Sequence, residues 1–387
     1  MQVLRRHAAA IIDQYDGLLP LSAFLNSYYK QHPVLGSKDR KIITERVFTF
    51  YRIAPLIKQY DADQQAYCVD VFMAERLSDK LLKNALKDSQ WIENGQTVDE
   101  RIEQLQQQGI EIQPEALVNH FPTLSEGIDT KAYARYLLAR NAVFIKPHAK
   151  FGKMVNAALE KHNVAFTALE NGLLRVDAST KLQEMLQPGW YRIQDASSVE
   201  TSIYFPNINP QKVWDACAGG GGKSLLLHEK YPDAVVHASD NRSFKLENLR
   251  TRFKEHGYRQ PVCFEWDGEV ESRTPPNGAP FDLILCDVPC SGSGTWARNP
   301  EGAYFFTPEM LQALVKKQQR IVTNAIQFLK PGGYLVYITC SVFRKENEDM
   351  IDHISTTGAW TIDRQIVING MQKQADCLFV ALLKRDE

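Results

Sequence analysis

From residue 211 to the C-terminus, short apolar runs alternate with longer amphipathic segments. The runs have the length of buried strands, and they predict strands over residues 212–216, 234–239, 261–266, 281–287, 334–339 and 378–383. Before the fifth run, apolar positions recur every three or four residues from Leu311 to Leu329. With Thr307 as N-cap, Pro308 in the first turn and 330–333 (Lys-Pro-Gly-Gly) at the end, this segment predicts a long helix. Strands joined by helices predict a doubly wound, Rossmann-like α/β sheet.

The first third of the chain has helical periodicity, so residues 1–130 predict a helical domain. Its clearest helix has an apolar face and a polar face. The apolar face comprises Ile43, Val47, Phe50, Tyr51 and Ala54, and the polar face comprises Lys41, Glu45, Arg46 and Arg52.

The pattern changes again in residues 131–200, which predict a small α+β lobe. Strands are expected over 142–145, 164–169 and 173–176, and a helix over 153–162. The Asn171-Gly172 pair between the last two strands predicts a hairpin turn. Because residues 206–210 have the composition of a linker, we place the sheet domain at about 201–387.

The net charge of −1 over 387 residues hides an uneven distribution. Lys and Arg exceed Asp and Glu by five in residues 1–60 and by five in 131–160, while acids are in excess by nine in 61–130. Such basic blocks fit either phosphate contacts or solvated helix faces. The first block contains Arg5, Arg6, Lys30, Lys38, Arg40, Lys41, Arg46 and Arg52.

The seven cysteines are scattered and form no Cys-x-x-Cys pair, so neither a zinc site nor a disulfide framework is indicated. Reduced thiols predict a cytoplasmic protein. The N-terminal apolar run stops at Asp13, too early for a signal peptide, and no apolar stretch is long enough for a membrane span. We therefore expect no membrane association. Four cysteines, Cys68, Cys263, Cys286 and Cys377, are expected to be small buried hydrophobic residues.

The other parts of the chain are organised around two strands that each end in a cysteine. Residues 281–287 form an apolar run, interrupted only by Asp282, that ends in Asp287-Val-Pro-Cys290. Residues 334–339 form a second apolar run that ends in Cys340. Open α/β sheets bind ligands at the carboxyl ends of their strands. The pattern therefore predicts two thiols and an aspartate at one edge of one sheet.

A glycine-rich loop follows the first predicted strand of this domain and opens a helix. The segment runs Cys217-Ala218-Gly219-Gly220-Gly221-Gly222-Lys223-Ser224, and glycines let a backbone approach a ligand closely. Gly-Gly-Lys-Ser nearly completes the phosphate-binding loop of an NTPase, although that motif requires glycine at position 217. An NTPase is therefore one of the alternatives.

Carboxylates at strand ends favour a nucleoside cofactor instead. Asp215, Asp240 and Asp267 end the first three strands, and Asp240 lies about twenty residues past the glycines, where a carboxylate can accept both ribose hydroxyls. Asp267 is expected to lie within reach of an adenine amino group. Acids in these positions would repel a triphosphate, but they suit a cofactor with a cationic sulfonium and a free amino group.

Two thiols beside an aspartate suit methylation of a pyrimidine. Cytosine C5 is a poor nucleophile until a thiolate adds to C6, after which C5 can attack an electrophilic methyl group. A base then removes the C5 proton and the thiolate leaves. Asp287 could bind the N3/N4 edge of the ring. The chemistry alone does not decide whether Cys290 or Cys340 is the nucleophile.

Three motifs resemble the RsmB/Sun (Fmu) family of RNA cytosine-C5 methyltransferases, which have a class I methyltransferase fold. They are Asp215-x-Cys217-Ala218-x-x-Gly221-Gly222-Lys223, Asp287-x-Pro289-Cys290-Ser291-Gly292-x-Gly294-x-x-x-Arg298-x-Pro300-Glu301 and Thr339-Cys340-Ser341-x-x-x-x-Glu346-Asn347. Gln194-Asp195-Ala-Ser-Ser198 resembles the entry to the family's catalytic domain. The resemblance covers residues 130–387.

The resemblance implies roles for individual residues. Cys340 would be the nucleophile, Cys290 would assist release of the enzyme, and Asp287 would complete the catalytic set. S-adenosylmethionine (AdoMet) would bind along Cys217, Ala218, Gly219, Gly220, Gly221, Gly222 and Lys223, with Asp240, Lys245, Asp267 and Asp287. No metal is implied.

Two departures and one weaker likeness refine these expectations. The family usually has Ala-Pro at Gly219-Gly220, which predicts weaker cofactor binding, and Arg and Asn near Lys146 and His148. Residues 35–52 resemble the NusB-like RNA-binding domain of RsmB-type members, which favours small-subunit ribosomal RNA over transfer RNA as the partner of a monomeric enzyme. A non-catalytic RNA-binding assembly factor of the same fold is the alternative from another class.

Overall fold

The structure is a computed structural model that describes residues 2–73, 97–177, 180–271 and 278–386. The chain forms two compact units. One comprises Met1–Phe121, Asp129–Arg140 and Trp296–Thr307, and the other comprises Pro122–Ile128, Asn141–Thr295 and Pro308–Glu387. Each unit is described by itself below.

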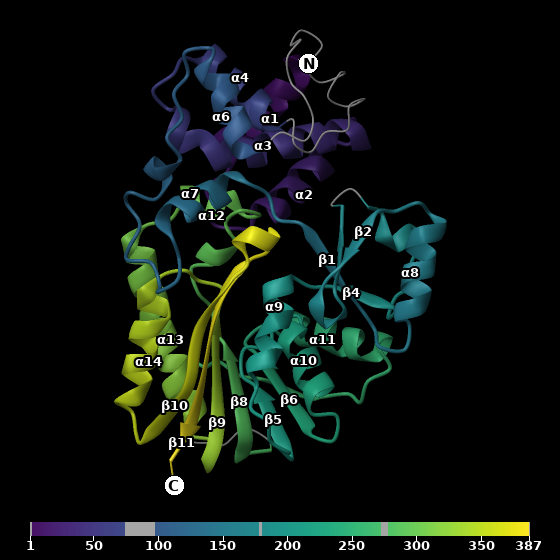
Figure 1. Ribbon diagram of the computed structural model, residues 1–387, viewed down its shortest axis with the longest axis vertical. Coiled ribbons are helices and arrows are strands. Elements are labelled where there is room, and N and C mark those ends of the chain that lie inside the picture. Colours follow the sequence, from purple (N-terminus) through teal and green to yellow (C-terminus); the bar gives the residue numbers. More distant parts are fainter. Residues whose placement is uncertain (1, 74–96, 178–179, 272–277, 387) are drawn as a thin grey trace. The chain divides into compact units, whose positions relative to one another are not determined.

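The larger unit is built on a seven-stranded sheet with the order β10-β11-β9-β8-β5-β6-β7 (Figure 1). The strands are β5 (Lys212–Asp215), β6 (Val235–Asp240), β7 (Val262–Glu265), β8 (Phe281–Asp287), β9 (Leu329–Thr339), β10 (Trp360–Asn369) and β11 (Cys377–Arg385). The five strands from β7 to β9 run parallel, while β11 is antiparallel to both β9 and β10. All six predicted strands are present.

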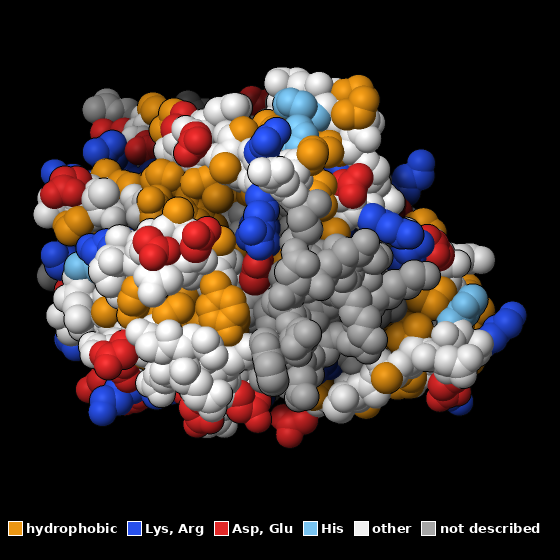
Figure 2. All heavy atoms as spheres, turned by 90° about the horizontal axis from the view of Figure 1, so that it is seen from above, with side chains coloured by type: hydrophobic (Ala, Val, Ile, Leu, Met, Phe, Trp, Pro, Cys, Tyr) orange, Lys and Arg blue, Asp and Glu red, His pale blue; other side chains and the backbone are white. Residues whose placement is uncertain are grey.

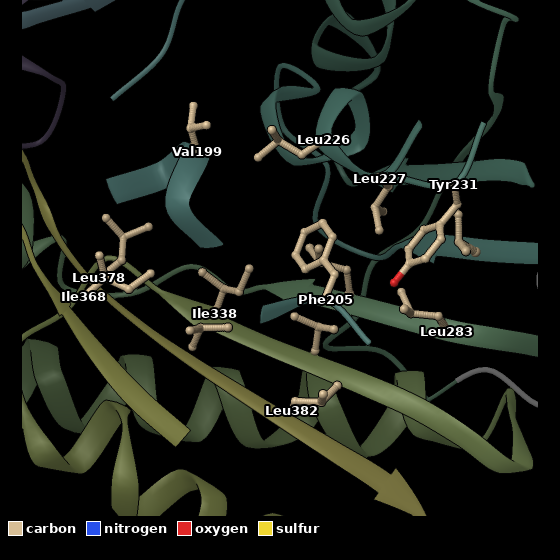
Figure 3. Close-up of a cluster of buried hydrophobic side chains, with 14 of the residues drawn as sticks. Val199, Phe205, Leu226, Leu227, Tyr231, Leu283, Ile338, Ile368, Leu378 and Leu382 are labelled. Carbon is tan, nitrogen blue, oxygen red and sulfur yellow. The ribbon is translucent and has the colours of Figure 1, made fainter. Parts of the chain in front are cut away.

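Helices cover both faces of this sheet, which confirms the doubly wound prediction (Figure 1). They are α9 (Ala196–Glu200), α10 (Gly222–Lys230), α11 (Ser243–Glu255), α13 (Pro308–Ile326) and α14 (Glu348–Ser355). Alternate residues of β8 point to opposite faces of the sheet. Leu283 packs into one cluster with Leu226 of α10, seen in Figure 3, and Ile284 packs into another with Ile321 of α13.

In the part of the chain that forms the seven-stranded sheet, the structure differs from the predicted elements in three places. β10 was not predicted, and it is an edge strand whose residues are mostly exposed. The long helix ends at Ile326 rather than Leu329. Residues 330–333 lie inside β9, where the register against β8 shifts, rather than in a terminating turn.

A smaller antiparallel sheet in the same unit has the order β2-β3-β1-β4 and packs against α8 (Gly152–Lys161). Its strands are β1 (Val143–Pro147), β2 (Phe166–Ala168), β3 (Leu174–Val176) and β4 (Tyr191–Ile193). The predicted hairpin is confirmed: β2 pairs with β3, and Asn171 and Gly172 both have positive φ. β4 was not predicted.

The smaller unit is helical, as expected. Its α-helices are α1 (Gln2–Gln14), α2 (Leu21–Gln31), α3 (Ser37–Ile57), α4 (Ala62–Met73), α6 (Val98–Gln106), α7 (Thr130–Leu138) and α12 (Pro300–Tyr304). Short 3₁₀ segments across both units are Pro114–Leu117, Glu170–Gly172, Leu182–Glu184, Thr201–Tyr204, Ser293–Thr295, Arg344–Glu346 and Met371–Lys373.

The predicted polar face of α3 is wrong for three of its four members. Glu45, Arg46 and Arg52 are buried, because each has a partner inside the unit. Arg46 pairs with Asp70, Glu45 pairs with Arg140, and Arg52 donates to the Ala297 carbonyl. Two arginines of the first basic block are therefore structural and cannot contact phosphates.

The visible charges are mixed in sign. On the face shown in Figure 2, Lys and Arg side chains lie among Asp and Glu side chains of the described residues. No helix within the described ranges is both long and apolar enough to cross a membrane.

Candidate active site

The loop between β5 and α10 needs its glycines for conformational reasons. Gly219 and Gly221 have φ of +52° and +84°, which residues with a side chain rarely adopt. A Cβ at Gly221 would also lie 2.7 Å from Leu249 Cγ of α11. The loop thus turns sharply against α11 and begins α10 at Gly222.

Asp215 ends β5 under this loop and is fully buried. Ser224 Oγ donates to its Oδ2 at 2.6 Å, while its Oδ1 has no hydrogen-bond partner among the described residues. Burial, with the charges of Asp287 and Asp240 nearby, raises the pKa of Asp215 to about 7. The site therefore holds a carboxyl group that a cationic ligand would stabilise in its ionised form.

Lys223 is buried and turned toward the same carboxylates. Its Nζ lies 2.8 Å from Ser198 Oγ and 3.5 Å from Asp287 Oδ2. Ser224, the other residue of the motif that resembles a phosphate-binding loop, is bonded to Asp215. Both side chains are thus engaged by protein groups, and the surrounding acids argue against a bound triphosphate.

A cavity of about 370 Å³ lies at the carboxyl ends of the parallel strands. This volume is within the roughly 300–1,000 Å³ of small-molecule sites. Cys217, Asp240, Asp267 and Asp287 line it, and Trp266 and Ile321 supply apolar wall. Three carboxylates beside an aromatic surface suit a ligand that joins a cation to an adenosine, so the residues present fit AdoMet.

The other predicted cofactor residues support this wall or lie away from it. Ala218, Gly219, Gly220, Gly221, Gly222 and Lys223 are not among the lining residues and instead shape the loop behind Cys217. Lys245 does not line the cavity either, and its Nζ lies 5.5 Å from the centroid of the Phe244 ring.

Asp240 has more partners than the sequence indicated. Its carboxylate accepts hydrogen bonds from the Gly219 N–H at 3.0 Å and from the Arg242 backbone and guanidinium at 2.9–3.2 Å. Burial alone would raise the pKa of Asp240, but these partners bring it below its ordinary value. Arg242 was missed, although its position two residues past a strand-end aspartate could have suggested the contact.

The structure brings the two predicted thiols together. Cys290 follows β8, Cys340 follows β9, and their Sγ atoms are 3.3 Å apart. Both residues are partly exposed. The hydrogen bond to Cys340, together with burial, raises the pKa of the Cys290 thiol well above its ordinary value. Cys290 therefore keeps its proton at neutral pH.

A fully buried carboxylate, Glu346, holds the loop that carries Cys290. Ser291 donates to it through its backbone N–H at 2.8 Å and its Oγ at 2.6 Å. Gln318 of α13 donates to Glu346 at 2.8 Å and to the Pro289 carbonyl at 3.0 Å. The loop after β8 is thereby fixed from both sides.

Asn347 fixes the loop that carries Cys340 by side-chain hydrogen bonds. Its side chain accepts from Thr339 Oγ1 at 2.5 Å and donates to the Ser341 carbonyl at 2.9 Å. The sequence motif contained Glu346 and Asn347 without a role for either. Gln318 stands in the sequence only as a polar residue on the apolar face of the predicted long helix.

Four of the other cysteines were expected to be buried. Cys68, Cys286 and Cys377 are buried as expected, whereas Cys263 is partly exposed. No cluster of three or more His, Cys, Asp or Glu side chains in the described ranges is placed to hold a metal ion.

The part of the chain that forms this site is similar to a known family. Residues 204–379 match the family described as 16S rRNA methyltransferase RsmB/F. Over 170 residues the chain is 33% identical to ribosomal RNA small subunit methyltransferase B of Salmonella paratyphi A, and 34% identical to that of Salmonella newport. Each alignment covers 42% of this chain and 38% of the relative, so the match spans little more than a third of the relatives' length.

Solved structures agree on the fold. The crystal structure of PH0851 superimposes with a TM-score of 0.69 at 18% identity, covering 95% of each chain. NSun6 from Pyrococcus horikoshii, solved with SFG, gives a TM-score of 0.58 at 15% identity over 71% of this chain and 97% of that chain.

The seven-stranded sheet and the carboxylate-lined cavity at its edge define a class I methyltransferase domain that uses S-adenosylmethionine. Residues 204–379, a little under half of the chain, match the RsmB/F methyltransferase family within this class. The resemblance found in the three sequence motifs is confirmed for this part.

Proposed function

We propose that this protein transfers a methyl group from AdoMet to C5 of a cytosine in RNA, with small-subunit ribosomal RNA as the substrate. The observation that carries the proposal is the pair of sulfur atoms 3.3 Å apart, Cys290 and Cys340, at the ends of neighbouring parallel strands. Asp287, three residues before Cys290, lines the cofactor cavity. A purely structural pair of cysteines would not need partial exposure beside a ligand site.

Cys340, Cys290 and Asp287 each have a separate role in the proposed reaction. The Cys340 thiolate forms a bond to cytosine C6, which makes C5 nucleophilic. Bound AdoMet supplies the electrophilic methyl group that C5 accepts. After loss of the C5 proton to a base, the bond between Cys340 and C6 breaks and the thiolate is regenerated. Cys290, which remains protonated beside Cys340, assists this release, and Asp287 binds the N3/N4 edge of the ring.

The choice of RNA rests on the relatives. The curated relatives named above are ribosomal RNA small subunit methyltransferases. Their names support ribosomal RNA over transfer RNA, and the segment that matches the family contains both thiols and the cofactor cavity.

Replacement of Cys340 tests the nucleophile. With labelled AdoMet and RNA, the Cys340→Ala protein should incorporate no methyl group, while calorimetry should show AdoMet affinity within about twofold of the unchanged protein. Cys263→Ala, which alters a cysteine away from the site, should retain activity. Methyl transfer by Cys340→Ala would show that Cys340 is not the nucleophile.

Bisulfite mapping of RNA from a deletion strain would identify the methylated cytosine. If the unchanged protein transfers no methyl group to ribosomal RNA or to transfer RNA, a role as a non-catalytic assembly factor is favoured.

Replacement of Cys290 tests the release step. The Cys290→Ala protein should accumulate a protein–RNA adduct that survives denaturing electrophoresis, because the bond between Cys340 and C6 forms but is not broken. The double variant, which also carries Cys340→Ala, should show no adduct. A Cys290→Ala protein that turns over without any adduct would reject this role.

A further inference from the structure

The two thiols of the candidate active site lie close to bonding distance of each other. Cys290 and Cys340 are 50 residues apart in sequence, yet their Sγ atoms are separated by 3.3 Å. The sulfur atoms of a disulfide are about 2.05 Å apart, so a bond between these two requires them to approach by about 1.3 Å. The strands that precede them, β8 and β9, are neighbours in the sheet (Figure 1).

Contacts between the two loops hold this approach in place. The Gly294 N–H, in the loop after β8, donates to the Cys340 carbonyl at 2.9 Å. A Cβ at Gly294 would lie 3.0 Å from that carbonyl oxygen and would overlap the Cys377 carbonyl, so the close contact requires glycine. The Val342 N–H also donates to Ser293 Oγ, at 2.9 Å. The fold therefore holds the two backbones together, and only the two side chains need to move to form a bond.

An oxidant can reach both sulfurs, because Cys290 and Cys340 are partly exposed. Cysteines that are oxidised reversibly are accessible and often have a second thiol beside them. The second thiol converts the first oxidation product to a disulfide before the sulfur is oxidised further. Cys286, four residues before Cys290, is fully buried and lies beyond such reach.

The protonation of the pair suits the two steps of disulfide exchange. The first step needs a thiolate, which Cys340 supplies in the proposed methyl transfer. The second step needs Cys290 to lose its proton. The hydrogen bond to Cys340 is the largest cause that raises the pKa of the Cys290 thiol, and burial is the next. Once Cys340 is part of a neutral mixed disulfide, the first cause is removed and the pKa of the Cys290 thiol falls.

We propose that Cys290 and Cys340 are an oxidative modification site, at which a small-molecule disulfide of the glutathione type produces an intramolecular disulfide that thiol reductants reverse. Formation of this disulfide follows from the geometry of the two loops, whereas its effect on methyl transfer rests on the proposed function.

The exchange balances in two steps. The Cys340 thiolate forms a bond to one sulfur of the oxidant, the S–S bond of the oxidant breaks, and one thiolate leaves. Cys290 then releases its proton to water and attacks Cys340 Sγ, the bond between Cys340 and the oxidant fragment breaks, and a second thiolate leaves. Two protein thiols are thereby oxidised to one disulfide, and one molecule of oxidant is reduced to two thiols.

Closure of the disulfide removes both sulfurs from the proposed reaction. A sulfur in a disulfide cannot add to cytosine C6, so methyl transfer should stop. Neither Cys290 nor Cys340 is among the residues that line the cofactor cavity, so the oxidised protein should still bind AdoMet.

Mass spectrometry of the full chain in glutathione buffers tests the proposal. The protein is equilibrated at increasing ratios of oxidised to reduced glutathione, free thiols are blocked with N-ethylmaleimide, and the chain is digested without reduction. A peptide pair linked through Cys290 and Cys340 should appear as the ratio rises and disappear with dithiothreitol. Cys290→Ala and Cys340→Ala should each give no such pair. Cys263→Ala, which alters another partly exposed cysteine, should give the pair at the same ratio as the unchanged protein.

Unfolding the chain separates a site built by the fold from two thiols that are merely reactive. At the same glutathione ratio in urea, the linked pair should be at least about tenfold less abundant, because the loops no longer hold the sulfurs together. An equal yield in folded and unfolded protein would overturn the proposal. A folded protein that acquires only glutathione adducts at these thiols, or that keeps both of them free at every ratio, would overturn it as well.

Methyl transfer measured in the same samples distinguishes this inference from the proposed function. Activity should fall in proportion to the linked fraction and return with dithiothreitol, while calorimetry should show unchanged AdoMet affinity. A protein that methylates RNA but never forms the linked pair would contradict this inference alone. A protein that forms the pair but transfers no methyl group when reduced would contradict the proposed function alone. Undiminished methyl transfer by the linked protein would overturn both.

Discussion

Loss of the buried Glu346 carboxylate should disturb the loop that carries Cys290. It is fully buried and accepts three hydrogen bonds, two from Ser291 and one from Gln318. Glu346→Ala removes both acceptor oxygens and with them all three hydrogen bonds. The Ser291 hydroxyl can turn to Ser293 or Ser341, at 3.1 and 3.3 Å, but the Ser291 N–H and the Gln318 amide lose a partner.

The magnitude follows from these two donors. A buried donor without an acceptor costs about 1–3 kcal/mol, so Glu346→Ala should lower the free energy of unfolding by about 4 kcal/mol. In Glu346→Gln the amide oxygen can still accept from both donors, and its NH₂ can donate to the Ser291 hydroxyl. Only the charge assistance is then lost, and the expected effect is about 2 kcal/mol.

Urea unfolding followed by far-UV circular dichroism gives the free-energy change, and hydrogen exchange reports on the loop. The Ser291 amide should exchange faster in Glu346→Ala, with Glu346→Gln intermediate. Glu184→Ala is the matched control, because Glu184 is exposed and its carboxylate forms an ion pair with Lys181 three residues away. Such a pair contributes less than about 1 kcal/mol.

One result would refute the reasoning about Glu346. If Glu346→Ala unfolds within about 0.5 kcal/mol of the unchanged protein and exchange across residues 288–294 is unaltered, the buried carboxylate does not hold the Cys290 loop. The position of the thiols would then have to come from the sheet alone.

Two further predictions concern the cofactor end of the site. The pKa of Asp215 is about 7 in the folded protein against 3.8 for the ordinary group, so the folded state binds more protons between these values and stability should fall as pH rises from about 4 to about 7. Asp215→Asn should remove on the order of 3 kcal/mol of that decline, measured as urea unfolding at pH 5 and pH 7.5, and an unchanged decline would contradict the burial argument. Gly221→Ala should weaken AdoMet binding at least tenfold in calorimetry, because a Cβ there meets Leu249 at positive φ. Gly222→Ala, whose Cβ would have 3.6 Å of room, should bind AdoMet normally, and equal affinities for the two variants would show that the loop geometry does not matter.

The sheet and its ligand edge could be predicted because the signals are local. Each parallel strand is a short apolar run that ends in an acid or a thiol, and buried strands of this kind have few alternatives. The same reasoning failed where burial depends on distant partners. Arg46 and Glu45 look like surface residues of an amphipathic helix, yet Asp70 and Arg140, 24 and 95 residues away, hold them inside. No periodicity records such a pairing.

The position of the two thiols follows partly from local sequence signals and partly from contacts with residues elsewhere in the chain. β8 and β9 are adjacent and parallel, with Asp287 opposite Ile338, so residues 290 and 340 must emerge at the same level of the same edge. That much follows from the apolar runs once the strands are neighbours. The 3.3 Å between the sulfurs does not, because both thiols lie beyond their strands, in loops whose course the sheet does not determine. Glu346 and Asn347, adjacent in sequence, each bind one of those loops. The strands therefore account for the level of the two thiols, and the buried side chains behind them account for their spacing.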